Sequence, residues 1–330
     1  MKKLMYREAV SSALAEEMRR DNKVFVMGED VALTGGVYKA TRGLLDEFGA
    51  SRVRNTPLSE IAIAGVATGA AMCGARPVAE IMHIDFTGVA MDIFLNQMSK
   101  MCYKTNGQVH VPMVIRTQGG RGKSNGCTQS QSLEALFTHI PGLKVVMPST
   151  PYDVKGLLKT AIRDNDPVIF IEHKGLYQTR GEVPEEEYLI PLGKADVKRE
   201  GKDVTIISWS KTVLTALDAA KELETLGIDA EVLDLRSLVP LDMEAIAQSV
   251  SKTGRVVITH EACERSGFGA EVAARIADEL FDELDAPILR VCGANIPVPN
   301  ATEPEIESAP TVARMIAAVK RVCQGGIENG

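Results

Sequence analysis

Short apolar segments alternate with longer helical patterns along almost the whole chain. KVFVMGED (23–30), RPVAEIM (76–82) and VPMVIRT (111–117) are apolar runs of strand length, and helical patterns such as 61–74 and 88–104 lie between them. Strands that are apolar on both faces need helices on each side, and parallel strands need a crossover connection. The alternation therefore predicts an α/β fold of mostly parallel sheets with helices on both faces.

The alternation is interrupted once, and the interruption divides the chain. Residues 181–202 are polar and acidic and contain two prolines, and a second α/β series begins at DVTIISWS (203–210). A length of 330 residues suits two domains. We therefore predict a first domain over 1–180, a linker over 181–202 and a second domain over 203–330.

Charge and cysteine content exclude several classes of protein. The formal net charge is −7, no block of Lys and Arg stands out, and no uncharged apolar run is long enough to span a bilayer. The six cysteines form no CxxC pair, and the N-terminal residues MKKLMYREAV do not resemble a signal peptide. We expect a cytoplasmic protein with reduced cysteines that binds neither nucleic acid nor a membrane.

Two glycine-rich segments lack the full pattern of a nucleotide-binding loop. VIRTQGGRGKSNG (114–126) has Thr117 where a P-loop needs glycine, and GFGAE (267–271) is followed by Val272 where a dinucleotide loop needs its last glycine. Ordinary loops are therefore favoured over phosphate loops at both places. The first loop also carries Arg121 and Lys123, which could hold an anion.

One carboxylate, Glu60, opens the small-residue segment EIAIAGVATG. Two interpretations stay open from the residues alone. Glu60 could simply favour the positive end of a helix dipole, with Ser59 as N-cap. Alternatively, an ionisable group at the mouth of an apolar helix could take part in chemistry. The five histidines show no metal-binding spacing.

Longer motifs carry a resemblance to a known family. They include RVRNTPLSEIAIAGVATGAAMCGARPVAEIM (52–82), HIPGLKVVMPSTPYDVKGLLKTAIRDNDPVIFIEH (139–173) and DLRSLVPLD (234–242). In their order along nearly the whole chain they resemble the beta subunit of the E1 component of 2-oxo acid dehydrogenase complexes, which are thiamine-diphosphate enzymes. EIMHIDFTGVAMD is most similar to the acetoin dehydrogenase branch.

The resemblance implies a fold and an activity. The first domain would be a pyrimidine-binding domain, and the second would be similar to the transketolase C-terminal domain. The activity would be decarboxylation of a pyruvate-like 2-oxo acid, or cleavage of acetoin, with transfer of the acyl group to lipoyl-E2. The second domain would also serve assembly and docking of E2.

The resemblance also assigns cofactor residues. Glu60 matches the glutamate that holds N1′ of the cofactor's aminopyrimidine, and Met82 and Phe86 match positions that pack on this ring. A carboxyl group in apolar surroundings can share a proton with a ring nitrogen that water would leave unprotonated. The small residues that follow Glu60 would let the ring lie close to the helix.

A second chain is implied by a missing motif. Thiamine-diphosphate enzymes bind Mg²⁺ and diphosphate through a GDG…N motif, and no GDG occurs in these 330 residues. An alpha subunit would therefore hold Mg²⁺ and the diphosphate in an α₂β₂ heterotetramer, in which the beta subunits also associate with each other. The chain alone should not turn over.

A structural K⁺ is also implied by the resemblance. The positions that match the family's ligands, most of them backbone carbonyls, are Met113, Ala161, Ile162, Asp164 and Asp166. Asp166 stands where asparagine is frequent, and hard oxygen ligands suit such a cation.

One position departs from the family pattern. The aligned loop reads CTQSQS (127–132), so Gln129 replaces the family's catalytic histidine, and glutamine cannot exchange a proton near neutral pH. Three explanations stay open. His83 substitutes for the missing histidine; the chain is a split transketolase-like carbon–carbon lyase or ligase whose anionic substrate Arg121 or Lys123 holds; or it is a structural paralogue. A P-loop protein and a non-catalytic assembly subunit are the rivals from other classes.

Overall fold

The computed structural model describes residues 1–324 and forms two compact units. The first unit comprises Met1–Gly120 and Leu136–Leu192. The second unit comprises Arg121–Ala135 and the described chain from Gly193 onward. The segment Arg121–Ala135 therefore belongs to the second unit although it lies within the sequence of the first.

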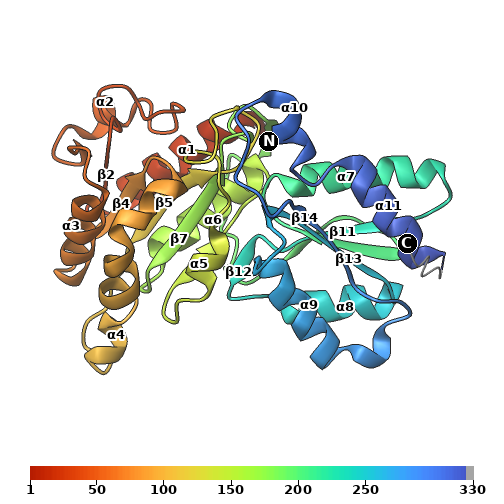
Figure 1. The fold of residues 1–330 in the computed structure, drawn as a ribbon. Helices are drawn as coiled ribbons and strands as arrows, with labels where there is room; N and C mark the ends of the chain where they lie inside the picture. Colours follow the sequence, from red (N-terminus) through yellow and green to blue (C-terminus); the bar gives the residue numbers. More distant parts are fainter. Residues whose placement is uncertain (325–330) are drawn as a thin grey trace. The chain divides into compact units, whose positions relative to one another are not determined.

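Six parallel strands form the central sheet of the first unit (Figure 1). Their order is β6–β7–β5–β4–β2–β3. In sequence order they are β2 (Val24–Gly28), β3 (Val53–Asn55), β4 (Arg76–Ile81), β5 (Val114–Gly119), β6 (Lys144–Val146) and β7 (Val168–His173). A separate antiparallel pair joins β1 (Lys2–Met5) to β8 (Arg180–Val183).

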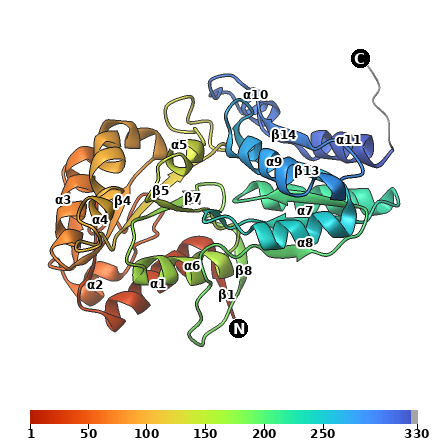
Figure 2. The same ribbon diagram turned by 90° about the horizontal axis from the view of Figure 1, so that it is seen from below.

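Helices cover this sheet, and two of them pair along their length. α1 (Tyr6–Arg20) packs on α6 (Pro151–Arg163), and the two helices lie side by side in Figure 2. α6 starts where Thr150 Oγ1 accepts a hydrogen bond from the Asp153 N–H at 3.1 Å, with Pro151 in the first turn. The remaining α-helices of this region are α2 (Leu44–Phe48), α3 (Glu60–Met72), α4 (Met101–Lys104) and α5 (Glu134–Thr138).

The second unit has a five-stranded sheet in the order β14–β13–β10–β11–β9. Its strands are β9 (Asp196–Arg199), β10 (Val204–Ser208), β11 (Ala230–Asp234), β13 (Val256–Cys263) and β14 (Leu289–Gly293), and only β9 runs antiparallel to its neighbour. A short strand β12 (Ser237–Val239) follows β11.

Helices lie on both faces of this second sheet. α7 (Thr212–Thr225) and α11 (Val312–Cys323) lie on one face, and α8 (Met243–Thr253) and α9 (Phe268–Glu279) lie on the other (Figure 1). A short 3₁₀ turn, η3 (Phe281–Glu283), and α10 (Thr302–Glu307) complete the unit. The core between the sheet and the pair α7 and α11 is built from Val, Ile, Leu, Ala and Met side chains.

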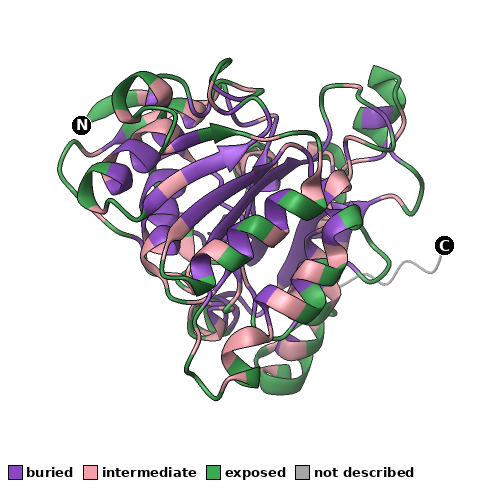
Figure 3. Cartoon of the chain, turned by 90° about the vertical axis from the view of Figure 1, so that its left-hand side faces the viewer, coloured by how far each residue is buried: buried purple, intermediate pink, exposed green. Residues whose placement is uncertain are grey.

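The predicted fold class is confirmed, and burial explains why the sequence indicated it. The central strands of the first unit are buried on both faces, whereas its helices expose their outer faces (Figure 3). Strands of this kind lack an alternating polar face and read as continuous apolar runs. Among residues 1–324, no helix is both long enough and apolar enough to cross a membrane.

Two expected segments differ from the structure. The helix expected over 88–104 is instead a 3₁₀ segment, η1 (Ile84–Ala90), a π segment, η2 (Ile93–Met98), and the short α4. The buried residues Ile84, Thr87 and Ala90 recur at every third position, which is the period of a 3₁₀-helix.

The segment 181–202, which we expected to be a linker, contains most of β8 and all of β9. Both strands are largely unburied, so their sequences are polar and carry no apolar run. The boundaries of the two domains at 180 and 203 stay a prediction.

A buried ion cluster ties three adjacent strands of the first sheet together. Arg116 on β5 donates to Glu80 on β4 at 2.6 Å and to Glu172 on β7 at 2.6 and 2.8 Å. Tyr177 donates its hydroxyl to Glu172 at 2.6 Å. Burial raises the pKa of Glu80, and the nearby positive charge of Arg116 opposes that rise. The two carboxylates therefore depend on one guanidinium for their compensation.

We predict that Arg116→Met lowers the free energy of unfolding of the chain by about 3–5 kcal/mol, because two buried carboxylates lose their cation. Urea unfolding followed by circular dichroism measures the loss. Arg19→Met is the matched control: Arg19 pairs with Glu47 at 2.5 Å on the surface, so its removal should cost at most about 1 kcal/mol. Equal losses in the two variants would contradict the assignment.

A second buried acid lies in the second unit. Glu134 is 1% exposed, and Trp209 Nε1 donates to its Oε1 at 3.3 Å. Burial raises the pKa of Glu134 to about 7, with a smaller contribution in the same direction from Glu261 and opposing contributions from Trp209 and Arg121. Trp209 also stacks on His260, with 5.0 Å between the ring centroids.

This pKa predicts a pH dependence of stability. An ordinary glutamate has a pKa of 4.5, so the folded state holds the Glu134 proton more tightly than the unfolded state does. Its contribution is fully favourable below about pH 4.5. It is lost as the pH rises from 4.5 towards 7, at up to about 1.4 kcal/mol per pH unit.

The measurement is urea unfolding between pH 5 and 8, followed by the fluorescence of Trp209, the single tryptophan of the chain. Glu134→Gln should be less sensitive to pH than the wild type over this range. Glu271→Gln, which changes an exposed glutamate of α9, should keep the wild-type slope. An unchanged slope in Glu134→Gln would show that another group causes the dependence.

Candidate active site

Glu60 occupies the first turn of α3, directly after β3 and a short loop. Its side chain is half-buried, and its carboxylate lies at the positive end of the helix dipole. The buried residues of α3 are Ile63, Ala64, Ala67, Thr68 and Ala71. Ser59 occupies the N-cap position of α3, as considered from the sequence, but its side chain makes no capping hydrogen bond.

Glu60 lies near three other carboxylates at this edge of the sheet, Glu29, Asp30 and Glu80. Glu29 follows β2 and is buried. Burial raises its pKa, and the charges of Glu60, Asp30 and Glu80 raise it further. β2 and β4 are neighbours, with Gly28 opposite Glu80. A Cβ on Gly28 would lie 2.7 Å from the Glu80 carbonyl oxygen, so only glycine allows this approach.

Residues after β4 form a second part of the site. α3 packs against both β4 and η1, which places this segment beside the helix of Glu60. Met82 and Phe86 are half-buried, and His83 is buried with its ring edge-to-face on Phe86 at 5.3 Å between centroids. The geometry therefore groups Glu60 with the Met82, His83 and Phe86 positions in one unit.

His83 has an unusual environment. Its Nδ1 atom is buried and has no hydrogen-bond partner within residues 1–324. Burial lowers the pKa of His83, the positive charge of Lys174 lowers it further, and Asp85 opposes these effects. The imidazole is therefore neutral near neutral pH and can accept or donate a proton at a nitrogen that the protein leaves unpaired.

The residues of the loop 121–135 belong to the second unit. Gln129 is half-buried, and its backbone N–H donates to Gly126 at 3.4 Å. Arg121 is buried: its backbone N–H donates to the Glu261 carboxylate at 2.5 Å, and its guanidinium donates to the Glu261 carbonyl. Lys123 is exposed. Arg121 thus stabilises the end of β13, and Lys123 is the more accessible of the two cations.

The predicted K⁺ ligands already accept protein hydrogen bonds. The Met113 carbonyl accepts from Val168 and the Ala161 carbonyl from Asp164, at 3.0 and 3.3 Å. Nη1 of Arg76 donates to the carbonyls of Ile162 and Asp164 at 3.1 and 2.8 Å.

The two carboxylates of this predicted set are also occupied by a cation of the protein. Lys144 Nζ lies 2.7 Å from the Asp164 carboxylate and 3.1 Å from the Asp166 carboxylate. Arg76 and Lys144 therefore provide positive charge at the oxygens where K⁺ was expected.

Sequence reasoning missed Glu29 and the buried partners Glu80 and Arg116. The signal for Glu29 was present, because the apolar run 23–30 ends in two acids, and the carboxyl ends of parallel strands gather at one edge of a sheet. The partners of Arg116 could not be predicted from the sequence, because a single arginine in an apolar run does not indicate which acidic residues compensate its charge.

Two family models match the chain. Residues 2–180 match the family described as "Transketolase, pyrimidine binding domain", and residues 193–315 match "Transketolase, C-terminal domain". The first match covers Glu60, His83 and the sheet that positions them. A solved structure described as a split-gene transketolase, inactive beta4 tetramer, has a TM-score of 0.80 at 27% identity. It covers 97% of this chain and 98% of that chain.

Curated relatives are closer in sequence. The beta subunit of 2-oxoisovalerate dehydrogenase from Bacillus subtilis is 50% identical, over 90% of this chain and 91% of the relative. The beta subunit of acetoin:2,6-dichlorophenolindophenol oxidoreductase from Cupriavidus necator is 46% identical, over 98% of this chain and 99% of the relative. With both matched domains in the expected order, the chain belongs to the family of beta subunits of 2-oxo acid and acetoin dehydrogenase E1 components.

Proposed function

We propose that the chain supplies the pyrimidine-binding half of a thiamine-diphosphate enzyme. This enzyme decarboxylates a 2-oxo acid, or cleaves acetoin, and passes the acyl group to a lipoyl-bearing E2. The observation that carries the proposal is the half-buried carboxyl of Glu60 at the mouth of an apolar helix. The identities of 50% and 46% to the two kinds of relative are too close to favour one substrate.

The residues at this site fit an aminopyrimidine ring. Such a ring needs flat apolar contacts and one acid next to a ring nitrogen. Met82 and Phe86 are half-buried apolar side chains on the segment that packs against α3, and Glu60 is the acid. The buried and unpaired Nδ1 atom of His83 is a further polar group that a bound ligand would satisfy.

Each residue has a separate task in this proposal. Glu60 would hold a proton between its carboxylate and the ring nitrogen, and Met82 and Phe86 would pack on the ring and exclude water from that hydrogen bond. Thiamine diphosphate supplies the electron sink that lets the bond beside a carbonyl break. Neutral His83 provides proton exchange at Nδ1, the role for which Gln129 has no ionisable group.

The family and the absence of a GDG motif both indicate that the chain works with partner subunits. The relatives are named as beta subunits, and the 330 residues contain no GDG motif for Mg²⁺ and diphosphate. We therefore assign those groups to an alpha subunit in an α₂β₂ assembly, and docking of E2 to the second unit. None of the six cysteines, all within residues 1–324, forms a disulfide, which suits a reducing cytoplasm.

The proposal includes K⁺ binding at Met113, Ala161, Ile162, Asp164 and Asp166. Arg76 already donates to the carbonyls of Ile162 and Asp164, and Lys144 pairs with the carboxylates of Asp164 and Asp166, so K⁺ would use the second lone pairs of these oxygens. The fold of this region does not need the ion to satisfy its buried oxygens.

The central prediction concerns Glu60→Gln in a complex reconstituted with the alpha subunit, thiamine diphosphate and Mg²⁺. Glutamine keeps the size of the side chain but cannot share an acidic proton. We expect the decarboxylation rate to fall by at least about 100-fold. Steady-state release of CO₂ from the 2-oxo acid, measured at saturating cofactor, tests this.

Glu271→Gln is the matched control for this variant, because Glu271 also lies in the first turn of a helix but is exposed on the second unit. It should keep wild-type turnover. Undiminished turnover of Glu60→Gln would refute the proposed role. Reconstitution with a lipoyl-bearing E2 separates the dehydrogenase from a lyase that works without lipoyl transfer, because only the former reduces the lipoyl group.

A second prediction distinguishes His83 from Gln129. His83→Asn should reduce turnover by about 100-fold or more and abolish the acidic limb of the pH–rate profile. Because the pKa of His83 is lowered, the neutral base persists to lower pH, and the wild-type rate should fall only below the usual pKa of 6.5. Gln129→His should leave the complex active. A His83→Asn complex with an unchanged profile would exclude His83.

A further inference from the structure

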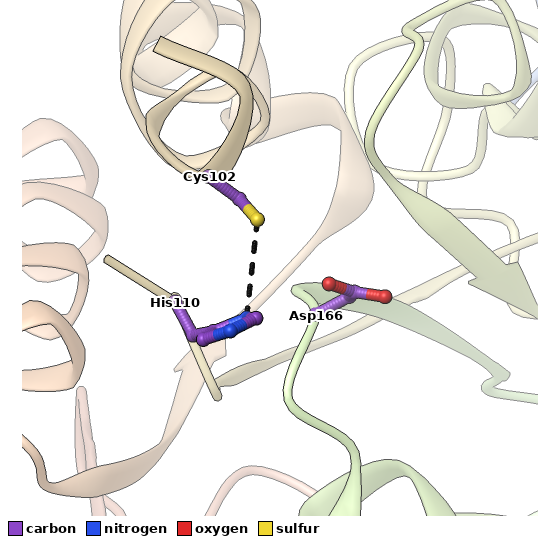
Figure 4. Close-up of side chains that lie close together, drawn as sticks. All are labelled: Cys102, His110 and Asp166. Carbon is purple, nitrogen blue, oxygen red and sulfur yellow. Dashed lines mark hydrogen bonds between the residues drawn. The ribbon is translucent and has the colours of Figure 1, made fainter. Parts of the chain in front are cut away.

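Three side chains with metal-binding atoms meet on the first unit, outside the candidate active site. Cys102 lies on α4, His110 follows the turn after α4, and Asp166 lies in the turn before β7 (Figure 4). Sγ of Cys102 is 3.9 Å from Nδ1 of His110. One ligand atom from each residue lies within 4.8 Å of the other two.

The backbone around α4 holds His110 beside Cys102. The N–H of Gly107 donates to the Cys102 carbonyl at 2.8 Å, and the N–H of Val109 donates to Thr105 Oγ1 at 3.0 Å. Asn106 and Gly107 both have positive φ, which reverses the chain within this short turn. The separation of eight residues between Cys102 and His110 therefore becomes a short distance in space.

Asp166 is positioned by contacts with Asp164 and Lys144. Its backbone N–H donates to Asp164 Oδ1 at 2.9 Å, and its Oδ2 lies 3.1 Å from Lys144 Nζ. A carboxylate has two oxygens, so Asp166 can contact Lys144 with one oxygen and present the other to a ligand. Lys144 has a second partner in Asp164, at 2.7 Å, and keeps that partner if Asp166 turns away.

We propose that Cys102, His110 and Asp166 bind a borderline divalent cation of the Zn²⁺ or Co²⁺ class. Zinc bonds to sulfur, imidazole nitrogen and carboxylate oxygen of about 2.0–2.3 Å place tetrahedral ligand atoms about 3.5 Å apart. The separation of 3.9 Å between sulfur and nitrogen is close to this spacing, so side-chain adjustment alone forms the site.

The donor set selects the class of ion. A thiolate and an imidazole favour zinc, cobalt and similar ions, whereas K⁺ and Mg²⁺ prefer oxygen ligands. His110 is exposed, and Cys102 and Asp166 are half-buried, so a fourth position is open to water. Three protein ligands with an open position describe an exchangeable site rather than a closed structural one.

The bound cation would connect two parts of the first unit. α4 and the segment after it supply two ligands, and the turn before β7 supplies the third. On binding, Cys102 loses its thiol proton and His110 must be neutral, so affinity falls at acid pH. Since the unfolded chain does not hold the three ligands together, the bound ion also stabilises the folded unit.

The test uses the full chain, freed of metal with a chelator and titrated with Zn²⁺ in equilibrium dialysis. We expect one Zn²⁺ per chain, and excess Mg²⁺ should not displace it. Cys102→Ser, His110→Ala and Asp166→Asn should each weaken binding at least tenfold. Cys73→Ser and His139→Ala, which change exposed residues of the same types in the same unit, should bind as the wild type does.

Two readouts on the wild-type chain do not depend on the variants. Co²⁺ should produce a thiolate-to-metal charge-transfer band, and Zn²⁺ should protect Cys102 from alkylation while Cys73 still reacts. Wild-type protein without bound Zn²⁺, unprotected Cys102, or Cys102→Ser with undiminished affinity would each overturn the proposal. Thermal melting by circular dichroism confirms that the compared variants are folded.

Discussion

The buried guanidinium of Arg116 is the interaction on which the first unit most depends. It lies on the middle one of three adjacent strands and compensates one carboxylate on each neighbour. A sheet that is apolar on both faces has few ways to fix the relative positions of its strands beyond backbone hydrogen bonds. Charge-assisted hydrogen bonds across β4, β5 and β7 add directional restraint at the level of the side chains.

This restraint acts close to the proposed cofactor site. Glu80 belongs to the buried cluster, and its carbonyl approaches Gly28, the residue before Glu29. Glu29 in turn lies in the electrostatic field of Glu60. Contacts through Glu80 and Gly28, followed by the charge interaction between Glu29 and Glu60, therefore relate the centre of the sheet to the acid that opens α3. Glu60 is half-exposed in the single chain, which agrees with the proposal that a ring and a second subunit cover it in the complete enzyme.

Sequence reasoning predicted the fold class, which is confirmed, and singled out Glu60, whose role stays a prediction, because both features are visible in short stretches of sequence. Runs of Val, Ile and Leu mark buried parallel strands, and an acid before a run of alanines and glycines is conspicuous. The strands β8 and β9 contain no apolar run that would have predicted them, because they are largely exposed and therefore polar. Contacts between residues far apart in the sequence could not be predicted either. Cys102 and Asp166 are 64 positions apart, and only the folded path of the chain brings them together.

The segment from Ile84 to Ala90 has a geometric consequence for the residues at its ends. A 3₁₀ segment rises about 2.0 Å per residue and an α-helix about 1.5 Å, so seven residues span about 3.5 Å more than an α-helix would. The segment therefore spans a longer distance between the end of β4 and the following π turns than an α-helix of the same number of residues. If the segment were an ordinary α-helix, Phe86 would shift along the helix axis although no residue of the candidate site had changed. The position of Phe86 in the candidate site therefore depends on the rise per residue of the backbone as well as on which side chains are present.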